Sequence, residues 1–500
     1  MATVEAYRVR AGRGVELGLL VLAIAIGVGA YALVGLGVEG VVPPDAAGYG
    51  AGLAGLALAV HLVLRWRAPY ADPVILPITV ALNGLGLAMI YRIDLAYESR
   101  EMAHGFASRQ LVTTAIAVAL AAAVLIFLRD HRTLRRFTYT AMVVALALVM
   151  LPLVPGLGQT INGARIWVSV GGQSFQPAEF AKIALAIFFA GYLVSNRDTL
   201  ALAGPKVAGL QLPRARDLGP ILVVWAVSLA VLVVQRDLGT SLLLFGVFVA
   251  MLYLATERIS WVVIGLVMFV GGAMAAASAF AHVAARFEAW LHAMDPVVFE
   301  RFPGGSGQLV RGLFGMASGG LFGTGLGNGR PDLVYAAESD FIMASLGEEL
   351  GLTGILAILM LYAILTERGM RTAIGVRDGF GKLLAGGLAF VIALQTFVVV
   401  GGITRLIPLT GLTTPFLAYG GSSLLANWVA VALLLRISDD ARRPAPALVR
   451  GVDPDLLPPE ADDDYDSPPH RTPISVGGGG GAHERDFEDE QPTERIGRRP

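Results

Sequence analysis

The chain alternates between long apolar segments and short polar ones. Runs of about twenty mostly apolar residues, the length a helix needs to cross the hydrocarbon core of a bilayer, recur along most of it. They predict an all-α fold, a polytopic membrane bundle of about twelve transmembrane helices. The expected spans cover residues 16–38, 47–65, 73–92, 110–128, 137–154, 179–195, 218–235, 240–256, 260–282, 347–366, 384–403 and 413–436.

The composition agrees with a membrane protein. Of 500 residues, 55% are hydrophobic and 15% charged, which lies outside the usual range of soluble domains. The 61 glycines suit helices that pack closely in lipid, and this favours a helical bundle over a barrel. The chain has no cysteine, so disulfides, thiolate nucleophiles and Cys-ligated zinc or iron–sulfur sites are excluded.

The charges of the loops predict the orientation. When alternate loops are assigned to the two sides, one side holds roughly twice as many Lys and Arg as the other, so both termini are expected in the cytoplasm. From residue 437 the apolar pattern stops, and Pro, Asp and Glu accumulate up to the five-glycine run at 477–481. Such a segment cannot bury enough surface to fold. We therefore expect a disordered cytoplasmic tail.

Two loops that face outward under this orientation carry most of the polar residues. The larger, 283–346, lies between the ninth and tenth expected spans, and the smaller covers 155–178. Long loops of this kind are more often functional than ornamental. The glycine-rich stretch 323–329 has no strand–helix unit around it, which argues against a nucleotide cradle.

Several charged residues lie where spans meet the outward loops. Glu179 and Lys182 are three positions apart at the start of a span, so on a helix they share one face and can pair. A purely structural ion pair is the alternative reading. Asp237 lies in a tight turn before the next span, where helix capping is the favoured role.

The outward loops offer further candidates for chemistry. A carboxylate in a partly buried cavity, such as Asp295, Glu300 or Asp340, can act as a general base, although simple solvation is the alternative. Arginines, among them Arg165 and Arg405, can hold a phosphate-bearing head group. The loop's one central histidine has no second ligand at metal spacing, so no metal site is expected.

Four sequence blocks together resemble the SEDS family (shape, elongation, division and sporulation) of RodA, FtsW and SpoVE, over roughly residues 75–440. The blocks are NGARIW at 162–167 with QPAEFAK at 176–182, DLGT at 237–240, SDFI at 339–342 leading to GEELG at 347–351, and PLTGLTTPF at 408–416 with YGGSS at 419–423. The last block and the stretch 327–332 look most like actinobacterial RodA-type members.

The resemblance implies a domain organisation. A cytoplasmic N-terminus would cover residues 1–15, two additional spans 16–72, and a ten-span glycosyltransferase core 73–436. The core would include the large extracellular loop 283–346, and the tail would cover 437–500.

The resemblance also implies an activity. Members polymerise lipid II into glycan strands at the outer face of the bacterial plasma membrane, with undecaprenyl pyrophosphate as leaving group, and work with a class B penicillin-binding protein. No nucleic-acid partner is expected. No cofactor follows from the residues, and a divalent cation, Mg²⁺ or Mn²⁺, is left open.

In this family the essential aspartate is the second acid of a Trp-Leu-(Asp/Asn)-Pro-x-x-Asp-Pro stretch followed by Gly-Tyr-Gln. Here Trp290 leads to Asp295 one position early, whereas counting back from Gln308 reaches Glu300. The resemblance therefore implies Asp295 as the catalytic base, with Glu300 as the alternate. The residues expected in the substrate-binding cavity are Glu179, Lys182, Arg165, Asp237, Asp340, Arg405, Ser422 and Ser423.

Two other functions compete with this one. A flippase for the lipid-linked precursor would suit a polytopic bundle with a charged cavity, and a charged path through both leaflets would favour it. A catalytically silent scaffold for the penicillin-binding protein is suggested by the altered Asp-Pro region around Asp295. The large outer loop and a base on the outside favour the enzyme.

Overall fold

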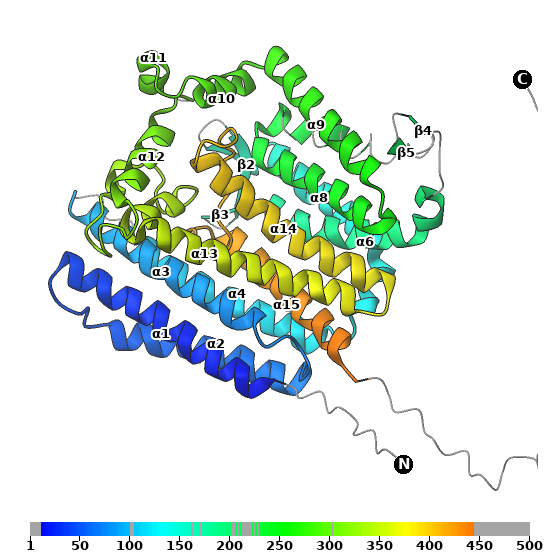
Figure 1. The fold of residues 1–500 in the computed structure, drawn as a ribbon, viewed down its shortest axis with the longest axis horizontal. Coiled ribbons are helices and arrows are strands. Elements are labelled where there is room, and N and C mark those ends of the chain that lie inside the picture. Colours follow the sequence, from blue (N-terminus) through cyan, green and yellow to red (C-terminus); the bar gives the residue numbers. More distant parts are fainter. Residues whose placement is uncertain are drawn as a thin grey trace, which may run out of the picture. The chain divides into compact units, whose positions relative to one another are not determined.

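The computed structural model describes residues 12–444 apart from 101–104, 162–163, 171, 202–205, 208–209, 212–222, 224–225, 228–229, 232 and 303. Helices dominate it, and most run along one common direction (Figure 1). The long helices are α1 (Arg13–Val38), α2 (Ala46–Arg67), α3 (Ile75–Glu98), α4 (Phe106–Phe127), α5 (Thr138–Met150), α6 (Ala178–Ala201), α8 (Leu238–Thr256), α9 (Ile259–Ala279), α13 (Ile342–Gly375), α14 (Gly379–Ile403) and α15 (Gly421–Arg442).

Within the described ranges, eleven segments are long and apolar enough to cross a membrane, one of which joins α5 to the short helices η1 (His131–Phe137) and η2 (Leu151–Leu153). They overlap eleven of the twelve expected spans. The remaining one, 218–235, lies largely outside the described residues, as do the expected N-terminal segment up to residue 11 and the tail from residue 445.

The last expected span, 413–436, is displaced along the chain. Residues 404–420 form a loop containing Pro408 and Pro415, since proline disfavours the interior of a helix, and α15 starts only at Gly421. Its far end continues to Arg442, beyond the expected boundary at 436. Ser438 and Asp439 are buried there and accept hydrogen bonds from the backbone N–H groups of Asp72 (3.0 Å) and Tyr70 (2.9 Å).

The expected outer loop 283–346 is largely helical. It contains α10 (Ala281–Leu291), α11 (Pro296–Glu300), α12 (Gly307–Gly319) and the short helix η4 (Pro331–Leu333). Proline at the first position of α11, with Asp295 as its N-cap, gives that helix a defined start. Next, α13 bends at Gly351, whose φ of 68° suits a residue without a side chain.

The smaller outward loop folds into strands, which the apolar pattern did not predict. Strands β1 (Gly158–Ile161), β2 (Ala164–Val170) and β3 (Gln173–Phe175) form an antiparallel sheet. A second sheet has only β4 (Lys206–Val207) and β5 (Leu210–Gln211). Such short segments carry too few alternating positions to be recognised from sequence.

Helix α3 is the centre of the bundle, because nearly every residue along it is buried. Helices α1 and α2 pack on it through a stack of tyrosine rings. The Tyr31 ring lies 4.3 Å from those of both Tyr49 and Tyr91, and the Tyr49 hydroxyl donates to the Gly84 carbonyl at 3.0 Å. Gly27 of α1 also touches the backbone of Gly84, so small residues allow these helices to approach closely.

We expect Gly86→Ala to destabilise the protein. A methyl group there would lie 2.4 Å from the Leu417 carbonyl oxygen, which is backbone and cannot easily move. Overpacking of this kind typically costs about 1–3 kcal/mol, which exceeds the gain in helix propensity. The matched control is Gly18→Ala on α1, where nothing lies within 4 Å. Thermal unfolding in detergent should show a lower Tm only for Gly86→Ala; equal Tm values would contradict this packing.

Candidate functional site

A buried ion pair forms the centre of the site. Glu179 and Lys182 lie on one face of the first turns of α6, as their spacing predicts, with 2.6 Å between Glu179 Oε2 and Lys182 Nζ. Their side chains are only 4% and 2% exposed. A charge pair so deeply removed from solvent requires further hydrogen bonds to offset its lost hydration.

Two amide side chains from other helices supply these bonds. The Lys182 ammonium also donates to Gln395 Oε1 of α14 at 2.8 Å and to Asn427 Oδ1 of α15 at 3.2 Å. Both amides are fully buried. Neither amide is among the residues that the sequence places in the cavity, although single polar residues within apolar spans often mark interhelical contacts. Lys182 therefore joins three helices.

The serines of the YGGSS block belong to the same cluster. Ser423 Oγ accepts a hydrogen bond from Asn427 Nδ2 at 3.2 Å, and Ser422 Oγ accepts from the backbone N–H of Gln176 at 2.9 Å. Gln395 in turn donates to the Thr413 carbonyl at 2.8 Å. Two of the four recognised blocks, the first and the last, thus meet around Lys182 although they are more than 200 residues apart in sequence.

Asp237 caps α8, as the turn motif predicted. Its Oδ1 accepts from the Thr240 backbone N–H at 3.0 Å, while Oδ2 is buried without a hydrogen-bond partner among the described residues. Burial raises the pKa of this carboxyl group, and the charge of Arg286 opposes that rise. The charge of Glu179 also acts on Asp237, so the two acids belong to one electrostatic cluster.

Arg286 of α10 interacts electrostatically with both Asp237 and Asp340, and it donates to the Leu409 carbonyl at 2.8 Å. Burial raises the pKa of Asp340 to about 6, despite a 3.1 Å hydrogen bond from the Ser339 hydroxyl. A carboxylate with its pKa nearer neutrality is a better proton acceptor than an ordinary one. Arg286 is one of the arginines of the outer loop 283–346, which the sequence predicts to hold a phosphate-bearing head group.

The two candidate bases lie elsewhere. Asp295 is exposed and caps α11, its Oδ1 accepting from the Val297 backbone N–H at 2.8 Å, and Glu300 is exposed at the end of the same helix. In the described contacts neither acid touches the cluster around Lys182. Both carboxylates are therefore open to solvent, rather than enclosed in a partly buried cavity.

Arg405 holds the segment that leads to Asp295. Its guanidinium donates to the backbone carbonyls of Trp290 at 2.8 Å and Leu291 at 2.9 Å, and the Trp290 indole N–H donates back to the Arg405 carbonyl at 3.0 Å. These bonds satisfy carbonyls at the C-terminal end of α10. Arg405 is therefore engaged with the protein, whereas Arg165 is half-buried on β2.

The glycine-rich stretch after α12 wraps around a carboxylate of its own chain. Glu349 accepts from the backbone N–H groups of Gly327 (2.9 Å) and Gly329 (3.2 Å) and from Arg92 Nε (2.7 Å). The preceding residue, Glu348, accepts a hydrogen bond from the backbone N–H of Arg330 at 2.9 Å. Successive N–H groups in such turns form anion-binding nests. The N–H groups of Gly327, Gly329 and Arg330 are therefore bound by carboxylates of the protein itself.

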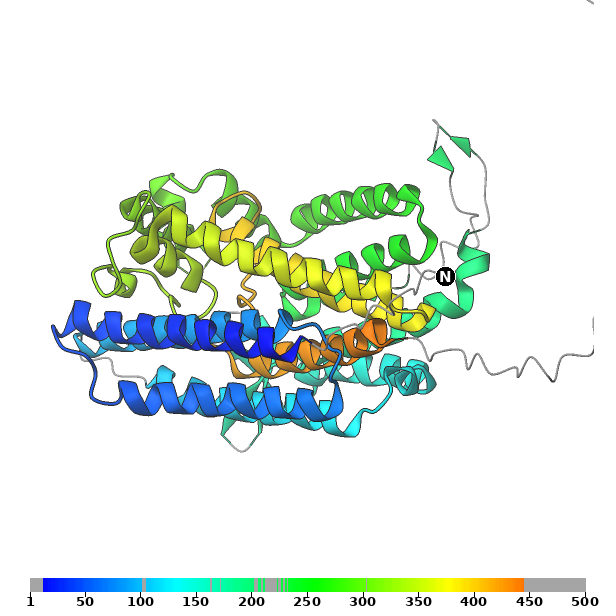
Figure 2. The same cartoon turned by 60° about the horizontal axis from the view of Figure 1, so that its bottom comes forward.

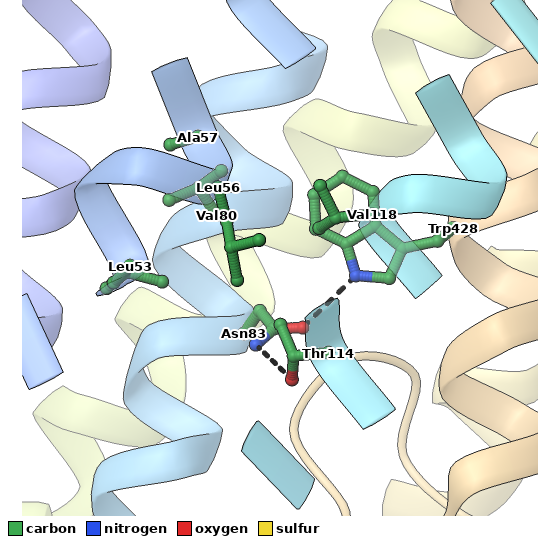
Figure 3. A pocket seen from close by; sticks show the side chains of 8 residues that line it. All are labelled: Leu53, Leu56, Ala57, Val80, Asn83, Thr114, Val118 and Trp428. Carbon is green, nitrogen blue, oxygen red and sulfur yellow. Dashed lines mark hydrogen bonds between the residues drawn. The ribbon is translucent and has the colours of Figure 1, made fainter. Parts of the chain in front are cut away.

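A small pocket lies apart from this cluster, between α2, α3, α4 and α15 (Figure 3). Its side chains are mainly apolar, and its cavity volume is only about 10 Å³. Its polar atoms pair with one another, because the Trp428 indole donates to Asn83 Oδ1 at 3.2 Å and Asn83 Nδ2 donates to Thr114 at 3.4 Å. None of the predicted site residues lines it.

The cell cycle protein family of FtsW, RodA and SpoVE matches residues 73–443. The chain belongs to this family. It is 50% identical to the peptidoglycan glycosyltransferase RodA of Mycobacterium tuberculosis over 88% of this chain and 94% of the relative, and 35% identical to the stage V sporulation protein E of Bacillus subtilis over 74% and 98%. The family and the spans establish a multi-pass membrane protein.

Solved structures share the fold. One, described as structural coordination of polymerization and crosslinking by a peptidoglycan synthase complex, matches with a TM-score of 0.58 and 23% identity over 75% of this chain and 99% of that chain. The rod shape determining protein RodA of Thermus thermophilus matches with a TM-score of 0.50 at 23% identity, over 75% and 98%. Helices α1 and α2 lie before the segment that the family model matches.

Lys182→Met should destabilise the protein strongly, because it leaves Glu179 buried without its countercharge. Breaking a buried pair in this way costs about 3–5 kcal/mol. The double variant Glu179→Gln with Lys182→Met removes both charges and should recover much of the lost Tm, but not activity. Thermal unfolding of the three proteins checks this; a double variant less stable than Lys182→Met would contradict it.

The raised pKa of Asp340 predicts a pH-dependent stability. Its folded pKa of about 6 exceeds the ordinary 3.8, so the folded state holds the proton more tightly. The resulting stabilisation is complete below pH 4 and is lost as the pH rises through 6. Between pH 4 and 7 the Tm of the wild type should fall relative to that of Asp340→Asn. Glu300→Gln, which removes an exposed acid, is the control; parallel curves for all three proteins would refute the shift.

Proposed function

We propose that this chain is a peptidoglycan glycosyltransferase that polymerises lipid II at the outer face of the bacterial plasma membrane, with both termini in the cytoplasm, and serves cell elongation, shape or division. Relatives with half of their residues identical carry the name peptidoglycan glycosyltransferase RodA. The observation that carries the proposal is the buried cluster of Glu179, Lys182, Gln395 and Asn427. Charged groups at membrane depth are costly and typically functional.

The reaction needs a base and a site for the pyrophosphate. The base takes the proton from the 4-hydroxyl of the acceptor sugar, and the oxygen forms a bond to the anomeric carbon of the donor. The bond from that carbon to undecaprenyl pyrophosphate breaks, its electron pair leaves with the pyrophosphate, and the anomeric centre is inverted. We assign the base to Asp295, with Glu300 as alternate, because an exposed carboxylate is accessible to a substrate presented at the membrane surface.

Cationic side chains can meet the charge of the leaving group. Arg286 interacts electrostatically with Asp237 and Asp340, and Arg165 is half-buried on β2. Lys182, whose three N–H groups are already donated within the protein, would act through its charge alone. A divalent cation, Mg²⁺ or Mn²⁺, would enter with the pyrophosphate. Among the described residues, one group of three side chains has metal-ligand atoms close together, namely His131, Asp378 and Asp440. This group lies at the opposite end of the spans, and Arg132 forms ion pairs with both of its acids.

We also propose a class B penicillin-binding protein as partner, which would crosslink the new strands. The solved synthase complex of the same fold supports this, since its description couples polymerization to crosslinking.

The distribution of buried charges favours the enzyme over a flippase. Along α3 the buried charges lie near its two ends, with Asp72 just before the helix and Arg92 and Asp94 in its last turns. Arg92 and Asp72 are about twenty residues apart on or next to α3, which corresponds to roughly 30 Å of helix. Between them, the buried polar residues of α3 are neutral, namely Thr79 and Asn83. A path for a charged head group would need charges between them.

Polymerisation of fluorescent lipid II by the purified protein with its penicillin-binding protein tests the assignment. Asp295→Ala should abolish polymer while leaving the Tm unchanged, because its side chain only caps a short exposed helix, and Glu300→Ala should retain activity. Loss only with Glu300→Ala would move the base to Glu300. If the wild type makes no polymer in a verified complex, the proposed enzyme is contradicted and the scaffold and flippase functions remain.

A further inference from the structure

Helix α12 and the turn after it belong to the expected outer loop, yet this turn is hydrogen-bonded to a helix that crosses the membrane. The backbone N–H groups of Leu352 and Thr353 donate to the carbonyls of Gly320 at 3.0 Å and Leu321 at 3.1 Å. Gly351 turns the chain at this point, so the spanning part of α13 starts at Leu352. These bonds satisfy N–H groups in the first turn of that helix, which would otherwise lack acceptors.

The depth of this junction follows from the length of α13. Its first charged residue on the other side is Glu367, about fifteen positions after Leu352, or roughly 22 Å at 1.5 Å per residue. The hydrocarbon core is about 30 Å thick. With Glu367 at one boundary, Leu352 lies inside the hydrocarbon, roughly 8 Å below the opposite boundary. Gly320 and Leu321 lie at the same depth, because they are bonded to it.

Large apolar side chains are exposed on α12 and on the turn after it, as this depth requires. Phe314 is 62% exposed, Leu321 54% and Phe322 79%, large values for apolar side chains. They continue the apolar stripe of α13, where Leu352 and Leu356 are exposed one helical turn apart. In Figures 1 and 2, α12 lies beside the ends of α1 and α3 and does not project beyond them.

We propose that α12 and the turn after it form a re-entrant element whose aromatic face is embedded in the acyl chains of the outer leaflet. Irregular backbone at membrane depth is tolerated only where the protein satisfies its polar groups. The turn meets this condition. The side-chain carboxylate of Glu349 accepts hydrogen bonds from the backbone N–H groups of Gly327 and Gly329, and its backbone carbonyl accepts one from the N–H of Gly325 at 3.0 Å. The occupant of the exposed face is bulk phospholipid, which covers the adjoining face of α13.

The element also sets the height of the candidate base. Ser306, the N-cap of α12, donates through Oγ to the Ala293 carbonyl at 2.6 Å and through its backbone N–H to the Val298 carbonyl at 3.0 Å. Asp295 lies between these two anchor points. A helix embedded in lipid would therefore hold Asp295 at the level where a lipid-linked sugar presents its head group, a consequence that rests on the proposed function.

Single cysteines test the embedding directly, because the natural chain has none. Phe314→Cys and Phe322→Cys would be labelled with bimane and reconstituted into phosphatidylcholine vesicles whose acyl chains carry bromine, a contact quencher. Leu356→Cys on the exposed face of α13 is the lipid-facing control, and Asn328→Cys, exposed on the polar turn, is the aqueous control.

Bimane at Phe314 and Phe322 should lose as much fluorescence as at Leu356 and more than at Asn328. Quenching no greater than at Asn328, together with equally rapid labelling of Phe322→Cys by a membrane-impermeant maleimide, would overturn the proposal. Leu321→Cys replaces Phe322→Cys if the latter fails to fold. The readout does not use polymerisation, so it stands or fails independently of the proposed enzyme.

Discussion

The absence of water from the hydrocarbon core governs this structure, because every buried polar group there must find its partner within the protein. Lys182 shows the consequence most clearly. Its single ammonium is satisfied by Glu179, Gln395 and Asn427, contributed by three helices that are distant in sequence. The relative positions of α6, α14 and α15 therefore depend on one cation. The same cation lies at the centre of the candidate site, so the stability of the bundle and the electrostatics of the site are coupled.

A second carboxylate organises the irregular part of the chain. Glu349 collects N–H groups from the glycine-rich turn and the guanidinium of Arg92, and so fastens that turn to α3. Glycine is required where the turn adopts positive φ, as at Gly327 (92°), which also touches the backbone of Gly37 on α1. The two helices that precede the family's matched segment are thereby placed against an element of the core.

The segment from α10 to the start of α12 is held by several hydrogen bonds, yet part of it is exposed to solvent. Arg405 and Arg286 fasten α10 to the loop before α15, and Ser306 fastens α11 to α12. Asp295 lies between these attachments without being buried by them. A carboxylate held on a short capped helix keeps its position while staying open to a large substrate. If Asp295 is the base, as proposed, preorganisation of this kind lowers the cost of bringing it to the reacting atoms.

The sequence by itself determined the membrane class, the approximate positions of ten of the spans and the pairing of Glu179 with Lys182, because these depend on composition and on the local period of a helix. It also indicated the cap at Asp237, which needs only three neighbouring residues. Only the tertiary structure decided that Gln395 and Asn427 complete the site, that Arg405 holds α10, and that α12 lies against a spanning helix. These contacts join residues tens to hundreds of positions apart. No local pattern carries that information, because it arises only when helices pack and their buried polar groups select partners.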